Sequence, residues 1–214
     1  TISLDMSSQL PRKPIIITFD DGYQDNYLYA FPILKGYGFT ATIFLVSGQI
    51  GGVNQWDILN GEEPANLLSI YEIREMAEYG ISFGGHTVTH PHLPQLSMNK
   101  AREEIVQCKK ALEEIIKQEV TSFCYPYGEF NHEVKQIVSD AGFNSACACD
   151  TDKINDLYEL GRRQIFPGTG LLSFFRKVQT WYPEYTKVRK QCQNMLRLKW
   201  GKMSSFTSLL HASV

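Results

Sequence analysis

Two adjacent carboxylates follow a strongly apolar run near the start of the chain. Asp20 and Asp21 stand in the segment TFDDG, directly after the three isoleucines at 15–17. Aspartate and glycine are common turn formers, so a simple turn is one interpretation. The other interpretation is a functional site at the end of a buried strand, where the two carboxylates could serve different purposes.

Three of the five histidines lie within seven residues, in the segment GGHTVTHPHL. His86 and His90 are four positions apart, a spacing that binds zinc in proteases when it falls on a helix. Gly84 and Gly85 before them and Pro91 after them favour a loop instead. Two imidazoles and one carboxylate make an open metal site that suits zinc, iron, cobalt or nickel.

A divalent cation would explain the pair of carboxylates. Without a cation, two carboxylates this close repel each other, and the pKa of one of them rises. With a cation between the histidines and one aspartate, both carboxylates can stay ionised near neutral pH. One aspartate would then bind the metal, and its neighbour would be free to accept a proton.

The elements that must position these residues alternate between short apolar runs and helical patterns. Strands are predicted at residues 14–20, 40–47, 81–87, 120–126, 143–149 and 162–166. Helices are predicted at residues 26–38, 69–80, 97–118, 132–142 and 172–182, with a Ser69–Glu72 capping box. A long loop is predicted at residues 49–66. This alternation indicates one α/β domain with a parallel sheet, and a barrel is favoured over an open sheet.

Sites in α/β barrels lie at the carboxyl ends of the strands. Asp20 and Asp21 follow the first predicted strand, and the two histidines follow the third. The segment CYPYGEF follows the fourth, and the pair Arg162–Arg163 lies near the sixth. The sequence therefore predicts that these groups meet at one edge of the sheet.

Composition and charge exclude some classes of protein. The chain has 214 residues and a net charge of −2, which argues against bulk binding of nucleic acid or of an anionic membrane. No run reaches the roughly 18 apolar residues that span a bilayer. The five cysteines are few and odd in number, so a disulfide scaffold is not expected, and Cys147 and Cys149 are interpreted as core thiols.

The two ends of the chain carry expectations of their own. No signal peptide is visible and the chain begins with Thr1, so we expect a processed or trimmed start from which an export signal or anchor was removed. Residues 1–183 are predicted to form the catalytic domain. Residues 184–214 are predicted to form a C-terminal helix and tail, and the basic stretch there is interpreted as a solvated helix.

The motifs TFDDG, H-T-x-x-H and YPYG, in this order, resemble those of the polysaccharide deacetylases of carbohydrate esterase family 4, the NodB-type homology domain. The resemblance extends from about Ile15 to Phe166. It implies a distorted (β/α) barrel and a divalent metal, usually Zn²⁺, with Co²⁺ or Ni²⁺ as alternatives. It also implies removal of N-acetyl groups from a glycan such as chitin, poly-N-acetylglucosamine or peptidoglycan, and it favours an extracytoplasmic location.

The resemblance also implies roles for individual residues. Asp20 matches the catalytic base of the family, and Asp21, His86 and His90 match its metal ligands. Tyr127 matches the residue whose backbone N–H helps to hold the oxyanion.

Two positions depart from the family pattern. The family commonly has an arginine where this chain has Cys124, and we expect Arg162 to replace it, with Arg163 as the alternative. A late histidine motif that supplies the general acid is also missing, which leaves that role open between His211 and His92.

Aromatic residues cluster around the motifs, and Trp56 and Tyr125 are predicted to contact sugar rings. The two departures leave a second hypothesis open, a carbohydrate-binding pseudoenzyme with the same fold. A metal-dependent hydrolase of another amide is the third.

Overall fold

The computed structural model describes residues 14–58, 61–149 and 156–179. The chain divides into two compact units, residues 1–162 and residues 163–214, and each is described by itself. The predicted domain boundary at residue 183 and the helix and tail at 184–214 lie outside the described residues.

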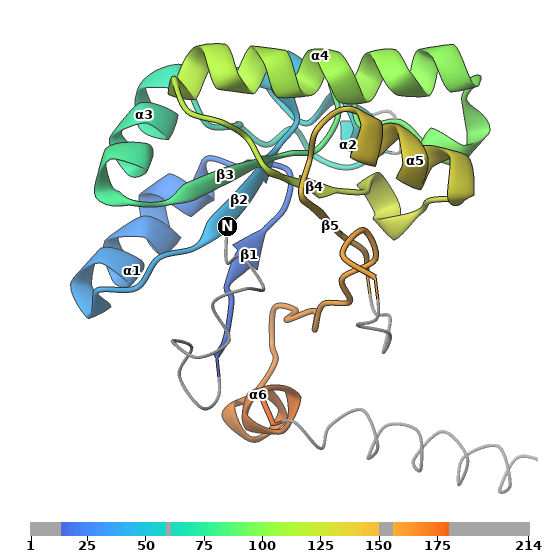
Figure 1. Cartoon of the computed structure of the whole chain (residues 1–214). Coiled ribbons are helices and arrows are strands. Elements are labelled where there is room, and N and C mark those ends of the chain that lie inside the picture. Colours follow the sequence, from blue (N-terminus) through green and yellow to red (C-terminus); the bar gives the residue numbers. More distant parts are fainter. Residues whose placement is uncertain (1–13, 59–60, 150–155, 180–214) are drawn as a thin grey trace, which may run out of the picture. The chain divides into compact units, whose positions relative to one another are not determined.

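Five parallel strands form one sheet in the first unit (Figure 1). The strands are β1 (Thr18–Phe19), β2 (Thr42–Leu45), β3 (Ser82–Gly85), β4 (Ser122–Cys124) and β5 (Ser145–Cys147). Their order in the sheet is the same as their order along the chain. All five were predicted from apolar runs, although the paired segments are shorter than those runs.

Sequential strand order explains why the sheet curls as part of a barrel. Parallel strands need a crossover connection, and crossovers are almost always right-handed. When each strand pairs with the next one along the chain, right-handed crossovers place all the helices on the same face of the sheet. Figure 1 shows α1, α3, α4 and α5 flanking the strands in this way. The predicted α/β fold with a parallel sheet is confirmed.

The helices begin and end where local signals place them. Their bounds are η2, a π-helix, at Asn26–Ala30, followed by α1 (Phe31–Tyr37), α3 (Ile70–Tyr79), α4 (Met98–Ile116) and α5 (His132–Asp140). The predicted capping box is present, with Ser69 and Glu72 bonded to each other's backbone N–H groups. Gly80 ends α3 at a φ of 114°, a left-handed conformation that glycine adopts readily.

The core lies between the sheet and these helices. Helix α4 buries the stripe predicted from its spacing, namely Ala101, Ile105, Cys108 and Leu112. These side chains pack with sheet residues such as Phe123. This packing fixes α4 against the strands, so that groups on its inner side are held at defined positions.

Two predictions about elements were wrong. The predicted loop at 49–66 contains a short helix, α2 (Gln55–Ile58), and a 3₁₀ turn, η3 (Ser47–Gln49), precedes it. Residues 162–166 do not form a strand. Parallel pairing ends at Leu160, which bridges Cys147, and residues 161–166 form no regular element. In the second unit, α6 spans Leu171–Lys177, which overlaps the helix predicted at 172–182.

No helix in the described ranges combines the length and the hydropathy that crossing a bilayer requires.

Candidate metal centre

The predicted chemical groups meet at the carboxyl edge of the sheet. Asp20 and Asp21 follow β1, His86 directly follows β3, and the segment with Tyr127 follows β4. Neighbouring parallel strands end at the same edge, and for this reason residues distant in sequence come together here.

Three ligand atoms converge on one point. The Oδ1 atom of Asp21 lies 3.2 Å from Nε2 of His86 and 3.3 Å from Nε2 of His90. Both imidazoles are buried, with 2% and 6% of their surfaces exposed. Atoms bound to a tetrahedral zinc at about 2.0–2.2 Å lie roughly 3.3–3.5 Å apart, so the spacing suits such an ion.

The hydrogen bonds of the triad also suit a cation. Nδ1 of His86 donates to the carbonyl oxygen of Cys124 at 2.7 Å, which leaves a lone pair on Nε2 for a metal. Oδ1 of Asp21 is buried and accepts no hydrogen bond among the described residues. A buried anionic oxygen without a donor, facing two imidazole nitrogens, is what a metal site requires.

The electrostatics of the triad are dominated by burial and by mutual attraction. Burial would raise the pKa of Asp21, but His86 and His90 hold it well below its usual range. Burial would lower the pKa of His86, but the Asp21 carboxylate raises it above its ordinary value. The pKa of His90 is lowered, chiefly by burial. A divalent cation binds unprotonated imidazole and would supply the positive charge that the carboxylate attracts.

Backbone strain gathers at the same place. Five non-glycine residues in the described part of the chain have a positive φ, and four of them belong to this site. They are Asp21 at 70°, Thr87 at 69°, His90 at 61° and Tyr127 at 59°. Such conformations are unfavourable for residues with a Cβ atom and are typical of functional sites, where the surroundings impose them.

Beside the triad, the carboxylate of Asp20 is held by Arg162. Nη1 of the arginine donates to Oδ1 at 2.6 Å, and Nη2 donates to Oδ2 at 2.7 Å. Nη1 also donates to Oγ1 of Thr18, and Nη2 donates to the sulfur of Cys124, both at 3.1 Å. The structure thus places Arg162 against the sulfur that stands where the family pattern has an arginine.

The arginine determines the charge state of Asp20. Burial would raise the pKa of this carboxyl group, but the hydrogen bonds and charge of Arg162, together with the charge of His86, hold it below its usual value. Burial would lower the pKa of Arg162, but its bonds to Asp20 outweigh burial and raise it. The two groups therefore form an ionised pair.

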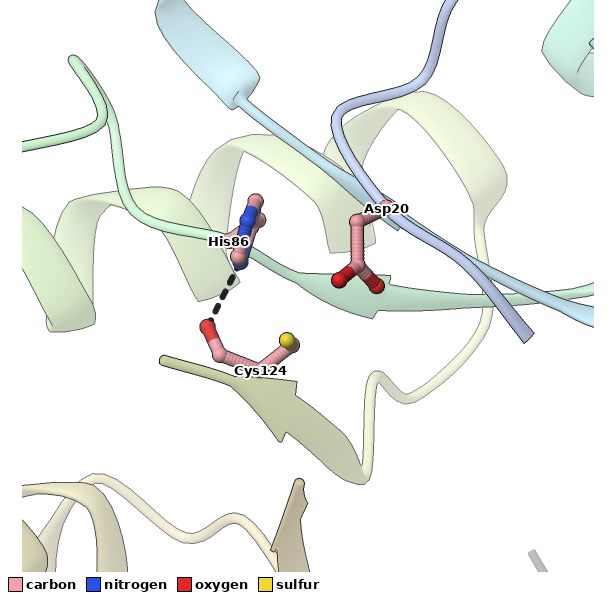
Figure 2. A group of neighbouring side chains, drawn as sticks. All are labelled: Asp20, His86 and Cys124. Carbon is pink, nitrogen blue, oxygen red and sulfur yellow. Dashed lines mark hydrogen bonds between the residues drawn. The ribbon is translucent and has the colours of Figure 1, made fainter. Parts of the chain in front are cut away.

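A second group of potential ligands is less suited to a metal. Figure 2 shows Asp20, His86 and Cys124 approaching one another from the ends of β1, β3 and β4. Both oxygens of Asp20 and the sulfur of Cys124 already accept hydrogen bonds from the Arg162 guanidinium. A metal ion between these three residues would be repelled by the positive charge of Arg162. We therefore interpret this group as the surroundings that hold the Asp20 carboxylate in place.

Tyr127 lies next to the site, and 40% of its surface is exposed. Its backbone N–H makes no hydrogen bond with any other described residue, so it is available to an oxyanion. Its ring is stacked on His92, with centroids 3.9 Å apart, and meets the edge of His90 at 4.6 Å. Nδ1 of His92 is 2.9 Å from Oε2 of Glu129. The other acid candidate, His211, lies outside the described residues.

Burial bears on the two predicted contacts to sugar, and one of them needs correction. Tyr125 is fully buried, its ring stacks on Phe130, and its hydroxyl donates to the carbonyl oxygen of Tyr158 at 3.0 Å. Trp56 is 6% exposed, and its ring lies 4.7 Å from that of His90. The burial of Tyr125 assigns its ring to the core, whereas contact of Trp56 with a sugar stays a prediction.

The supporting roles of two residues were not predicted from the sequence, although Thr87 is the threonine of the H-T-x-x-H motif. Oγ1 of Thr87 donates to the carbonyl oxygen of His86 and accepts from the backbone N–H of His90 at 3.0 Å. Glu104 of α4 also bonds to this loop. One signal for Glu104 was present, because an acidic residue three positions after Ala101 lies near the buried stripe of an amphipathic helix.

Comparison with known proteins assigns the chain to a single protein family. The family model described as polysaccharide deacetylase matches residues 7–146. The Bacillus subtilis protein YxkH is 30% identical over 171 residues, covering 78% of this chain and 57% of YxkH. A poly-beta-1,6-N-acetyl-D-glucosamine N-deacetylase of Staphylococcus aureus is 28% identical over 166 residues, covering 70% of this chain and 54% of that protein. The chain thus spans a little over half the length of these curated relatives.

A solved structure shares the fold. The Streptococcus pyogenes deacetylase PplD, solved in complex with acetate, superposes with a TM-score of 0.67 and is 28% identical. The match covers 81% of this chain and 74% of PplD. The predicted barrel type of fold is therefore confirmed.

Proposed function

Because the chain belongs to the polysaccharide deacetylase family, we propose that it removes N-acetyl groups from a polysaccharide by metal-dependent hydrolysis. The observation that carries this proposal is the convergence of Asp21, His86 and His90 beside a second carboxylate, Asp20. Amide hydrolysis needs a group that polarises the carbonyl and a base that takes a proton from water, and these four side chains can supply both.

The metal ligands in this proposal are Asp21, His86 and His90, and zinc is the ion that the donor set suits best. Two imidazole nitrogens and one carboxylate oxygen leave a fourth position open. A bound divalent cation would polarise the acetamide carbonyl and acidify the attacking water.

Asp20 is the proposed general base. An ionised carboxylate has about four lone-pair positions, and the two hydrogen bonds from Arg162 leave room for a water molecule. As the water oxygen bonds to the carbonyl carbon, one of its protons passes to Asp20. Arg162 keeps the carboxylate ionised and oriented before this step.

The backbone N–H of Tyr127 is the proposed donor to the oxyanion that forms at the carbonyl oxygen. A preorganised donor of this kind typically contributes about 3 kcal/mol to the stability of the transition state. The carbon–nitrogen bond then breaks, the amine leaves with a proton, and acetate is released. His92 and His211 are the two candidates for the donor of that proton.

The proposed substrate is a polymer of N-acetylglucosamine. The names of the Staphylococcus aureus relatives support this class, because they specify poly-beta-1,6-N-acetyl-D-glucosamine. The pairing of Asp20 with Arg162 favours an active enzyme over a pseudoenzyme. Cys124 stands where the family commonly has an arginine, and a missing cation beside the base would argue for lost activity. Arg162 supplies that cation. A protein that only bound carbohydrate would not need an oriented, ionised base beside a metal site.

Release of acetate from a panel of acetylated glycans tests the proposal. The panel contains oligomers of β-1,6-linked N-acetylglucosamine, chitin oligomers and peptidoglycan fragments, each assayed with and without a chelator. We expect release from the β-1,6-linked oligomers, loss with chelator, recovery with added zinc, and no release by Asp21→Ala. Acetate release that persists in chelator-treated, metal-free protein would contradict the proposed mechanism.

A further inference from the structure

The loop between the two metal-site histidines is held by a carboxylate from a distant helix. Oε2 of Glu104 accepts hydrogen bonds from the backbone N–H groups of Val88 at 2.8 Å and Thr89 at 2.9 Å. Oε1 accepts a hydrogen bond from Oγ1 of Thr89 at 2.8 Å. All three donors lie between His86 and His90, so a single side chain holds the middle of the loop.

Glu104 is itself held in place by the core. It lies on α4, which spans 19 residues. Its neighbours on the inner side of that helix, Ala101, Ile105 and Cys108, are at most 2% exposed. Hydrogen bonds to an ionised carboxylate are about twice as strong as bonds between neutral groups. The 86–90 loop is therefore bound strongly to α4, a helix that is fixed by the core.

Backbone hydrogen bonds from η3 hold the opposite side of the 86–90 loop. The N–H groups of Ser47 and Gly48 donate to the carbonyl oxygens of Thr87 and Val88, both at 3.0 Å. A Cβ atom at Gly48 would come within 2.6 Å of the Val88 oxygen, so only glycine allows this approach. The carbonyl groups of Thr87 and Val88 thus accept hydrogen bonds from η3, while Glu104 accepts hydrogen bonds from the N–H groups of Val88 and Thr89.

The loop needs these restraints because its backbone is strained. Thr87 and His90 both have a left-handed φ, which costs about 1–3 kcal/mol per residue where the surroundings do not impose it. Relaxation of either residue would turn an imidazole away from Asp21. We propose that Glu104 is a positioning residue that keeps the 86–90 loop in its metal-binding conformation, an inference that rests on the metal centre of the proposed function.

Metal affinity of the Glu104→Gln variant tests this inference. Glutamine has the same size, but one of its two terminal groups is an NH₂ donor that cannot accept from the loop. Zinc is titrated into metal-free protein in competition with a chelating dye, and cobalt is added separately to record its absorption spectrum. We expect the zinc dissociation constant to rise about 10- to 100-fold, the range typical of groups that orient metal ligands without binding the metal, and we expect the cobalt spectrum to change.

The neighbouring glutamate provides the matched control. Glu103 is an exposed residue of the same helix, so Glu103→Gln removes the same charge without touching the loop. Its zinc affinity should equal that of the wild type. Thr89→Val, which removes one of the three contacts, should raise the zinc dissociation constant by a smaller factor of about 3–10.

The outcomes separate this inference from the proposed function. A wild type that binds zinc, together with a Glu104→Gln variant of the same zinc affinity, would overturn the inference even if thermal stability falls. If Glu104→Gln does not fold, Thr89→Val decides, and an unchanged affinity in that variant overturns the inference. A wild type that binds neither zinc nor cobalt would overturn the proposed metal centre, and this inference with it.

Discussion

Arg162 holds the carboxylate of Asp20 through two parallel hydrogen bonds of 2.6 Å and 2.7 Å, although the two residues are 142 positions apart. A bidentate arginine–carboxylate pair fixes both the charge and the orientation of the acid. The sulfur of Cys124 lies 3.1 Å from the same guanidinium and is only a weak neutral partner. The cation beside the proposed base thus comes from a residue 38 positions after Cys124 in the chain.

Replacing Arg162 by alanine should move the acidic limb of the pH profile of kcat/KM to higher pH. Burial raises the pKa of Asp20, and the hydrogen bonds of Arg162 are the largest influence that lowers it. Without them the pKa rises, so that, as the pH falls, Asp20 is protonated and activity is lost at a higher pH than in the wild type. We also expect kcat to fall by at least about tenfold, since a base that is poorly oriented transfers protons less efficiently.

Arg162→Lys is the control for this experiment. It keeps a positive charge but loses the planar pair of donors, so its acidic limb should lie between those of the wild type and of Arg162→Ala. If the acidic limb of Arg162→Ala is unchanged, or moves only in Arg163→Ala, Arg162 does not control the pKa of the base.

Replacing Asp20 should affect kcat, whereas replacing Asp21 should affect metal binding. Asp20→Asn should retain metal and lose about 10²–10⁴-fold in kcat, the usual effect of removing a general base. Asp21→Ala should lose metal, because it removes the carboxylate oxygen that faces both imidazoles. Elemental analysis of the two purified variants, together with kinetics, distinguishes them. Equal loss of metal in both variants would refute the division of roles.

Cys124→Ser should change kcat by no more than about threefold. The sulfur accepts a hydrogen bond from Arg162, and a serine hydroxyl can accept the same bond. The carbonyl oxygen of Cys124, which orients His86, belongs to the backbone and is retained. Steady-state kinetics at neutral pH provides the measurement. A large loss of kcat with normal metal content would show that the thiol itself is needed.

Tyr125→Phe should lower stability and leave KM unchanged. The hydroxyl of this buried residue donates to the carbonyl oxygen of Tyr158, and its removal leaves that oxygen without this donor. The expected loss is about 1 kcal/mol in the free energy of unfolding, measured by urea denaturation. An increase in KM at unchanged stability would mean instead that this ring contacts the substrate.

The sequence alone was sufficient for the groups at the strand ends. Apolar runs and stop signals located all five strands of the sheet, and parallel order brings their carboxyl ends to one edge. Asp20, Asp21, His86 and His90 each lie just after a strand, so their meeting could be predicted from chain order. Local periodicity and local turn chemistry determine these features, and both can be read from neighbouring residues.

Tertiary structure decided which side chains support those groups. Arg162 was one of two neighbouring candidates, and Glu104 was not recognised, because their partners lie on other elements. The strand predicted at 162–166 was wrong, since pairing with β5 ends at Leu160 and Arg162 binds Asp20 instead. The burial of Tyr125 was also missed, because the sequence gives a residue's type but not which face of the packed sheet it meets. Contacts between distant segments depend on how the helices pack on the sheet, and only the folded chain determines that packing.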